Sequence, residues 1–235
     1  MTSFRLDELP WIPVVSVDGT ATDVNLYEVF SRSEEFLALA GSPPEVAALT
    51  RFLLAIAHLT ETPTSLKRWN QLWETRTEFM KGCAQYVSSQ AGAWDLFDTQ
   101  YPFGQVPDLD KTRNPAHLLV YEAARKNNAV FADHSIETDP VCRPLAVLAR
   151  GLITTNAYAG SSGGGYRSGP LAMRTVATLC GRNLTETLLL NLLVQEEAPA
   201  KYSWETYGHS TGDTSVPADL VQRYLWTSRR ARLLW

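Results

Sequence analysis

Five glycines lie within the ten residues from 160 to 169, and this glycine segment is the part of the sequence most suited to binding chemistry. Glycine allows a positive φ and lets another group approach the backbone without a Cβ in the way. Two arginines, Arg167 and Arg174, flank the glycines. Because backbone N–H groups and arginine side chains both bind phosphate, the segment is a candidate site for a phosphate-containing ligand.

Three interpretations fit this spacing. A phosphate could bind at the N-terminus of a helix beginning near Leu171, but the segment is not GxxxxGK[ST], nor does a GxGxxG follow a clear strand. A nucleotide-binding enzyme is therefore weakly supported. A bare glycine backbone could instead enter the minor groove of B-DNA, which is only about 6 Å wide. The segment could also be a flexible connector between two helices.

The remaining polar residues show no arrangement typical of catalysis. His58 lies in an apolar stretch that predicts a helix, where a structural histidine is expected. His134 follows Asp133, but no nucleophile partner is visible, and the sequence contains no GxSxG elbow. Glu196 and Glu197 are adjacent, so on a helix they would face apart. We therefore expect no catalytic residues and a protein that is not an enzyme.

The cysteines and the apolar runs exclude several further classes. Cys83, Cys142 and Cys180 are scattered and form no CxxC pair, so we expect no disulfide framework, metal site or cofactor. The longest apolar runs, 52–57 and 188–194, are far shorter than the roughly 20 residues of a membrane span. No basic, then apolar, signal opens the chain. We expect a cytoplasmic protein with no membrane partner.

The overall charge conflicts with a free-standing nucleic-acid binder. The 235 residues carry a net charge of −4 and a sequence pI of about 5.6, whereas such binders usually have a basic excess. The conflict is smaller if the chain docks on a larger assembly, because the local placement of arginine and lysine then matters more than their sum.

The elements that would position the glycine segment are mainly helical. Residues 11–17 alternate and end at Asp18-Gly19, which predicts a strand and a turn, with a partner strand near 24–27. Apolar spacing predicts helices within 43–59, 65–86, 145–158 and 171–180, and one capped by Asn183 or Thr185 that runs through 188–194. The expected fold is a single α+β domain, mainly α-helical, with a small N-terminal sheet.

Five motifs, in this order, resemble the CasA family, the large subunit of the type I-E CRISPR Cascade complex. They are PWIPV at 10–14, WDLF with YPFGQVP at 94–107, KNNAVFADH at 126–134, GGGYRSGPL at 163–171 followed by RNL at 182–184, and WTSRRARL at 226–233. Each motif alone is weakly specific, but their order across nearly the whole chain is specific.

The resemblance implies a subunit that inspects double-stranded target DNA for a protospacer-adjacent motif (PAM). In the family a glycine loop enters the minor groove. By position this loop corresponds to Ser161, Ser162, Gly163, Gly164 and Gly165, with Arg167 beside them. The family often has glycine where this chain has Ser161. Since the minor groove mainly distinguishes A·T from G·C, such a reader should accept several motif sequences.

A second loop is implied to contact the 5′ handle of the guide RNA and the DNA near the motif. Its residues are Asn128, Phe131, Ala132 and Asp133. An exposed phenylalanine can stack on a base or wedge a base step.

The implied partners are the guide RNA, double-stranded target DNA, other Cascade subunits and a separate helicase-nuclease. Residues 1–235 would form the N-terminal domain, with the family's C-terminal helical bundle outside this chain, which leaves a fragment and a natural short form as alternatives. A scaffold subunit that docks guide RNA but reads no DNA also stays open, with the glycine segment as a hinge.

Overall fold

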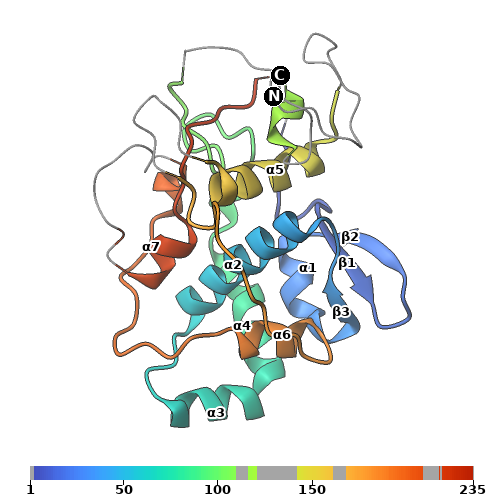
Figure 1. Cartoon of the computed structure of the whole chain (residues 1–235), viewed down its shortest axis with the longest axis vertical. Coiled ribbons are helices and arrows are strands. Elements are labelled where there is room, and N and C mark those ends of the chain that lie inside the picture. Colours follow the sequence, from blue (N-terminus) through green and yellow to red (C-terminus); the bar gives the residue numbers. More distant parts are fainter. Residues whose placement is uncertain are drawn as a thin grey trace.

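The computed structural model describes residues 3–109, 116–120, 142–160, 168–208, 217 and 219–234. In this part of the chain, helices surround one long central helix, and a small three-stranded sheet lies at one side (Figure 1). The expected α+β fold, mainly helical with a small N-terminal sheet, is confirmed. No helix among the described residues has the length and apolar character needed to cross a bilayer.

The sheet is antiparallel, in the order β2-β1-β3, and is formed by β1 (Ile12–Ser16), β2 (Ala21–Val24) and β3 (Phe36–Leu39). Gly19 adopts φ +85°, the left-handed conformation that suits the turn between β1 and β2. The expected hairpin is confirmed, but β2 ends earlier than predicted. Asn25 caps helix α1 (Leu26–Ser31) by accepting from the Glu28 N–H at 2.8 Å, so the chain turns helical at this point.

Helix α2 (Pro43–Thr60) is the centre of the core. Its middle is buried on most sides, and the Phe52 ring contacts four aromatic rings from distant parts of the sequence. These are Trp11, Phe103, Trp204 and Tyr207, with ring centroids 5.7 to 6.4 Å away. Two aromatic residues of the 94–107 region, Trp94 and Phe103, are therefore part of the core.

The region 65–86, expected to be helical, forms two helices, α3 (Leu66–Glu74) and α4 (Arg76–Ser89), which meet at Thr75. Helix α6 (Leu184–Leu190) begins after Asn183, one of the two caps that the sequence offers, but ends before 194. The described residues also form α7 (Leu220–Tyr224) and short 3-10 helices, namely η1 (Ser33–Glu35), η2 (Ala91–Ala93), η3 (Ala116–Leu119) and η4 (Trp204–Thr206).

Helix α5 (Leu145–Tyr158) forms as predicted and packs across α2. Arg150 ties it to both neighbouring layers. The guanidinium donates to the Trp11 carbonyl at 2.8 Å and pairs with Glu45 of α2 at 3.4 Å and Asp23 of β2 at 3.6 Å. The position of α5 relative to α2 and the sheet is therefore set by a largely buried charge as well as by apolar packing.

The helix predicted over 171–180 is wrong. A turn at 170–173 is followed by chain without regular secondary structure, and Met173 has φ +56°. The side chain of Asn191 accepts from the Leu179 N–H at 3.1 Å and donates to its carbonyl at 2.8 Å. Because Asn191, the residue that ends α6, satisfies these backbone groups of Leu179, they need no helical hydrogen bonds. Thr175 and Val176 are β-branched, which also disfavours a helix.

His58 is the buried histidine expected on α2, and it makes stability depend on pH. Its Nδ1 lies 3.0 Å from the Thr62 hydroxyl, and burial lowers the His58 pKa from 6.5 to about 4. The folded chain thus holds neutral imidazole where the unfolded chain binds a proton. The free energy of unfolding should fall as the pH drops from about 6.5 toward 4, by on the order of 3 kcal/mol from this group.

The variant His58→Asn keeps a polar atom near Thr62 and does not titrate. We expect its free energy of unfolding, from urea titrations between pH 7.5 and 4, to decline less steeply than that of the wild type. Carboxylates titrate equally in both proteins, so the difference between the two curves isolates His58. Parallel curves would contradict a neutral, buried His58.

Candidate nucleic-acid interface

All ten residues that the sequence assigns to nucleic-acid contact lie outside the described residues. They are Ser161, Ser162, Gly163, Gly164, Gly165 and Arg167 in the glycine segment, and Asn128, Phe131, Ala132 and Asp133 in the second loop. The structure does describe the residues that flank both ranges, and these flanks show how each range is attached to the core.

The glycine segment is attached through a closed neck, which we define as residues 157–160 and 168–171. The Gly169 N–H donates to the Ala159 carbonyl at 2.7 Å, and the Leu171 N–H donates to the Ala157 carbonyl at 2.9 Å. Two backbone hydrogen bonds therefore hold the stretch that enters the glycine segment against the stretch that leaves it, at the C-terminal end of α5.

The two glycines of the neck differ in their surroundings. A Cβ on Gly169 would lie 2.4 Å from the Ala157 carbonyl oxygen and 2.6 Å from that of Asn156, whereas a Cβ on Gly160 would meet nothing within 4 Å. Glycine at 169 is thus required by the close approach of two backbones. This glycine serves the attachment of the segment rather than contact with a ligand.

A buried asparagine connects the neck to the C-terminal segment, which we define as residues 226–234. The Asn156 side chain accepts from the Arg229 N–H at 2.8 Å, and the Asn156 carbonyl accepts from the Ser228 hydroxyl at 2.8 Å. The Arg229 guanidinium also donates to the Gly160 carbonyl. The basic motif at 226–233 therefore contacts the root of the glycine segment directly.

The C-terminal segment also bonds to the 94–107 region. The Val106 N–H donates to the Ala231 carbonyl at 3.0 Å, and the Leu233 N–H donates to the buried Gln105 side chain at 2.6 Å. Gln105 in turn donates to the Leu96 carbonyl at 2.7 Å. Three motifs that are far apart in the sequence thus meet at one end of the molecule.

Helix α7 fixes the start of the C-terminal segment. The Arg51 guanidinium of α2 donates to the Arg223 carbonyl and lies over the Tyr224 ring, 5.1 Å from its centroid. Burial lowers the pKa of Arg51. In Figure 1 the C-terminal segment, in red, runs from α7 past α5.

The second loop is attached to α5, the helix that also carries the neck. Before it, η3 packs so closely on α5 that a Cβ on Gly151 would lie 2.5 Å from the Leu119 carbonyl oxygen. After it, the chain returns through Arg143 to Pro144, which precedes the first turn of α5. Both ranges that carry candidate contact residues therefore begin or end on α5.

Charge is divided unevenly along the chain. Residues 140–185 contain five arginines and residues 220–235 contain four, and neither range has an aspartate or glutamate. By contrast, residues 1–109 contain seven lysines and arginines against fourteen acidic residues. The two acid-free ranges include α5, the neck and the C-terminal segment. Arg150 and Arg182 nevertheless pair with carboxylates outside these ranges. Among the described arginines of the two ranges, Arg174, Arg230 and Arg232 are exposed and form no ion pair with another described residue.

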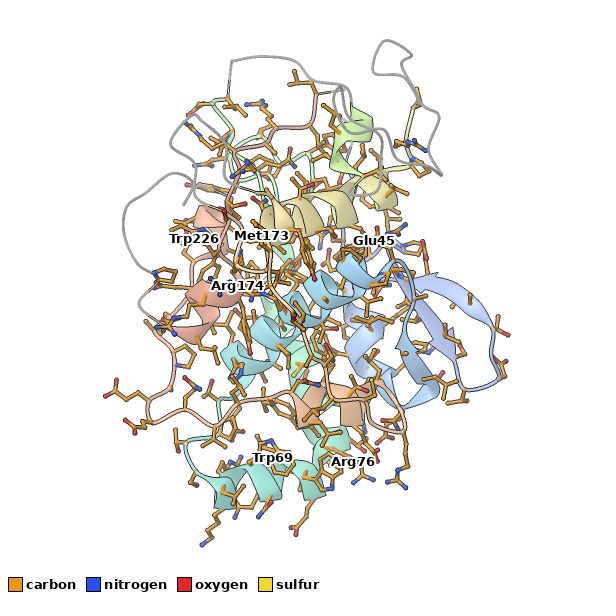
Figure 2. The ribbon with its side chains drawn as sticks, viewed as in Figure 1. Glu45, Trp69, Arg76, Met173, Arg174 and Trp226 are labelled. Carbon is orange, nitrogen blue, oxygen red and sulfur yellow. The ribbon has the colours of Figure 1, made fainter. Side chains whose placement is uncertain are left out.

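The described residues remove the basis for a phosphate cradle at a helix N-terminus. Residues 168–182 contain a turn and no helix, so no helix begins directly after the glycine segment, and the next one, α6, starts only at Leu184. Arg174 is exposed beside Met173, in chain that passes α5 and α2 in the view of Figure 2. Within the described part of the chain, no cluster of three His, Cys, Asp or Glu side chains could hold a metal ion.

The sequence matches the family described as CRISPR-associated protein Cse1 over residues 6–235. It is 31% identical over 255 residues to CRISPR-associated protein CasA/Cse1 of Thermus thermophilus, an alignment covering all of this chain and 49% of that protein. The chain spans about half the length of this relative.

The fold is similar to that of solved structures. Thermus thermophilus CasA (Cse1) matches with a TM-score of 0.75 and 26% identity, over 98% of this chain and 49% of that one. Thermobifida fusca Cse1 matches with a TM-score of 0.75 and 26% identity, over 99% and 49%. A chain of a CRISPR RNA-guided surveillance complex shares the fold, with a TM-score of 0.70 and 24% identity over 87% and 47%.

The neck provides a matched pair of glycine substitutions. Gly169→Ala would push a Cβ into the Ala157 carbonyl and break the two backbone bonds of the neck, so we expect a loss of about 1–3 kcal/mol in the free energy of unfolding. Gly160→Ala faces open space and should change it by less than about 0.5 kcal/mol. Urea titration of both variants measures this. Equal losses would contradict the neck as described.

Proposed function

Because the chain belongs to the Cse1 family of CRISPR-associated proteins, we propose that it is a non-catalytic subunit of an RNA-guided Cascade surveillance complex that recognises the PAM of double-stranded DNA. Its glycine segment enters the minor groove. Residues 1–235 correspond to the N-terminal domain of the longer relatives.

The observation that carries this proposal is the construction of the neck. Two backbone hydrogen bonds, a glycine that cannot be replaced without a clash, and the Asn156–Arg229 bond hold the root of the segment on the core. A hinge needs none of these constraints. A probe that must reach the floor of a narrow groove needs a fixed root, because an unfixed one would lose conformational entropy on binding.

The chemistry of the groove explains the residue types. Glycine and serine at 161–165 leave the backbone N–H groups accessible and add little width, as a groove of about 6 Å requires. Arg167 and Arg174 contact phosphates, which positions the protein without selecting a sequence. Recognition through the minor groove is therefore permissive, mainly separating A·T from G·C.

The second loop contacts the guide RNA. Phe131, with Asn128, Ala132 and Asp133, binds the 5′ handle and the DNA beside the motif, since a phenylalanine can stack on an unpaired base. Its attachment to α5, the helix that also carries the neck, supports a shared role for the two loops. Other Cascade subunits hold the chain in the complex, and the DNA-bound complex recruits a separate helicase-nuclease.

The decisive variant is Gly164→Leu, tested in the fully assembled complex with guide RNA. Binding is measured on duplexes that differ only in the motif beside the target. A branched side chain is too wide for the groove, so we expect the affinity ratio between favoured and disfavoured motifs to fall from about 5- to 150-fold, the usual effect of one base pair, toward one.

The control is Gly92→Leu, at an exposed glycine where a Cβ meets nothing within 4 Å. It should leave the ratio unchanged. Unaltered motif discrimination by Gly164→Leu would favour the scaffold interpretation, in which the subunit docks guide RNA and reads no DNA.

A further inference from the structure

The C-terminal segment carries two arginines, Arg230 and Arg232, that take no part in the hydrogen bonds to the neck. Exposure alternates along it: Arg230, Arg232 and Leu234 are exposed, and Ala231 and Leu233 are half-buried against the core. A period of two is typical of extended chain, in which alternate side chains share a face about 7 Å apart. Arg230 and Arg232 thus project from the same side of the segment.

These two arginines lack protein partners in the described part of the chain. Neither makes an ion pair or a side-chain hydrogen bond there, in contrast to Arg32, Arg68 and Arg150, which all pair with carboxylates. The range 220–235 has no aspartate or glutamate that could neutralise them locally. Two uncompensated guanidiniums on one face favour an anionic partner.

The backbone that carries these arginines is held on both sides. Ser228 and Arg229 bond to Asn156 just before them, and the Ala231 carbonyl and the Leu233 N–H bond to the 94–107 region between and after them. Binding a ligand therefore costs side-chain freedom only, because the backbone is already ordered.

We propose that Arg230 and Arg232 bind phosphates of the target duplex next to the point where the glycine segment enters the groove. This inference rests on the proposed function. The guanidinium fork matches a phosphate with two parallel hydrogen bonds. The DNA assignment follows from position, since the preceding residue, Arg229, donates to Gly160 at the root of the glycine segment. Such contacts set register and add affinity without reading sequence.

The test is the double variant Arg230→Gln/Arg232→Gln in the assembled complex with guide RNA. Duplex binding is measured across a range of salt concentrations. Each lost phosphate contact should reduce the slope of log affinity against log salt by about 0.9. Two contacts then predict a slope smaller by about 1.8, binding about 30-fold weaker at 0.15 M salt, and nearly equal affinities near 1 M.

The matched control is Arg32→Gln/Arg68→Gln, which removes the same charge from exposed arginines that are paired with Glu35 and Glu61. Its slope should equal that of the wild type. Equal slopes for the two double variants would overturn the proposal. So would loss of the Arg230→Gln/Arg232→Gln chain from the RNA-loaded complex before DNA is added, because that result places the arginines on RNA or on another subunit.

Motif discrimination separates this inference from the proposed function. Arg230→Gln/Arg232→Gln should weaken binding to all duplexes equally and leave the motif ratio intact, whereas Gly164→Leu should change the ratio. A reduced salt slope together with a Gly164→Leu variant that still discriminates would support the phosphate contacts and reject groove reading. The reverse pattern would reject the phosphate contacts alone.

Discussion

The close contact between the Gly169 backbone and the end of α5 is the constraint on which the candidate interface depends. It brings two stretches of the chain, 157–160 and 168–171, within hydrogen-bonding distance, so the glycine segment leaves and rejoins the core at one place. Asn156 satisfies its buried polar groups by bonding to Ser228 and Arg229, which couples this place to the C-terminal segment. Leaving such buried groups unpaired would cost about 1–3 kcal/mol each.

Around this constraint the molecule separates its charges. Residues 1–109 carry an acidic excess, whereas the C-terminal segment carries arginines with no acidic residue near them in the sequence. A chain with a net negative charge can therefore still present a local group of exposed arginines, such as Arg230 and Arg232. In the proposed function, most of the affinity for DNA would come from other parts of the assembly, because a few exposed arginines supply only a few phosphate contacts.

Local sequence patterns correctly predicted the elements whose conformation depends mainly on residues near them in the sequence. Helix α5 and the start of α6 at Asn183 follow from apolar spacing and capping. The helix expected after Leu171 failed because Asn191, on another element, takes the hydrogen bonds of Leu179. The helix break at Thr75 and strand β3 also depend on neighbours that a local pattern cannot include.

By itself the sequence determined the fold class, the family and the unusual density of glycine between two structured regions, because composition, periodicity and ordered motifs are properties of the chain alone. Only the tertiary structure decided that Gly169 serves packing, that Asn156 and Arg229 hold the neck, and that three motifs share one end of the molecule. The bonds of Asn156 and Gln105 to the C-terminal segment join residues more than seventy positions apart. Contacts over such separations are set by how the core packs, which no local pattern contains.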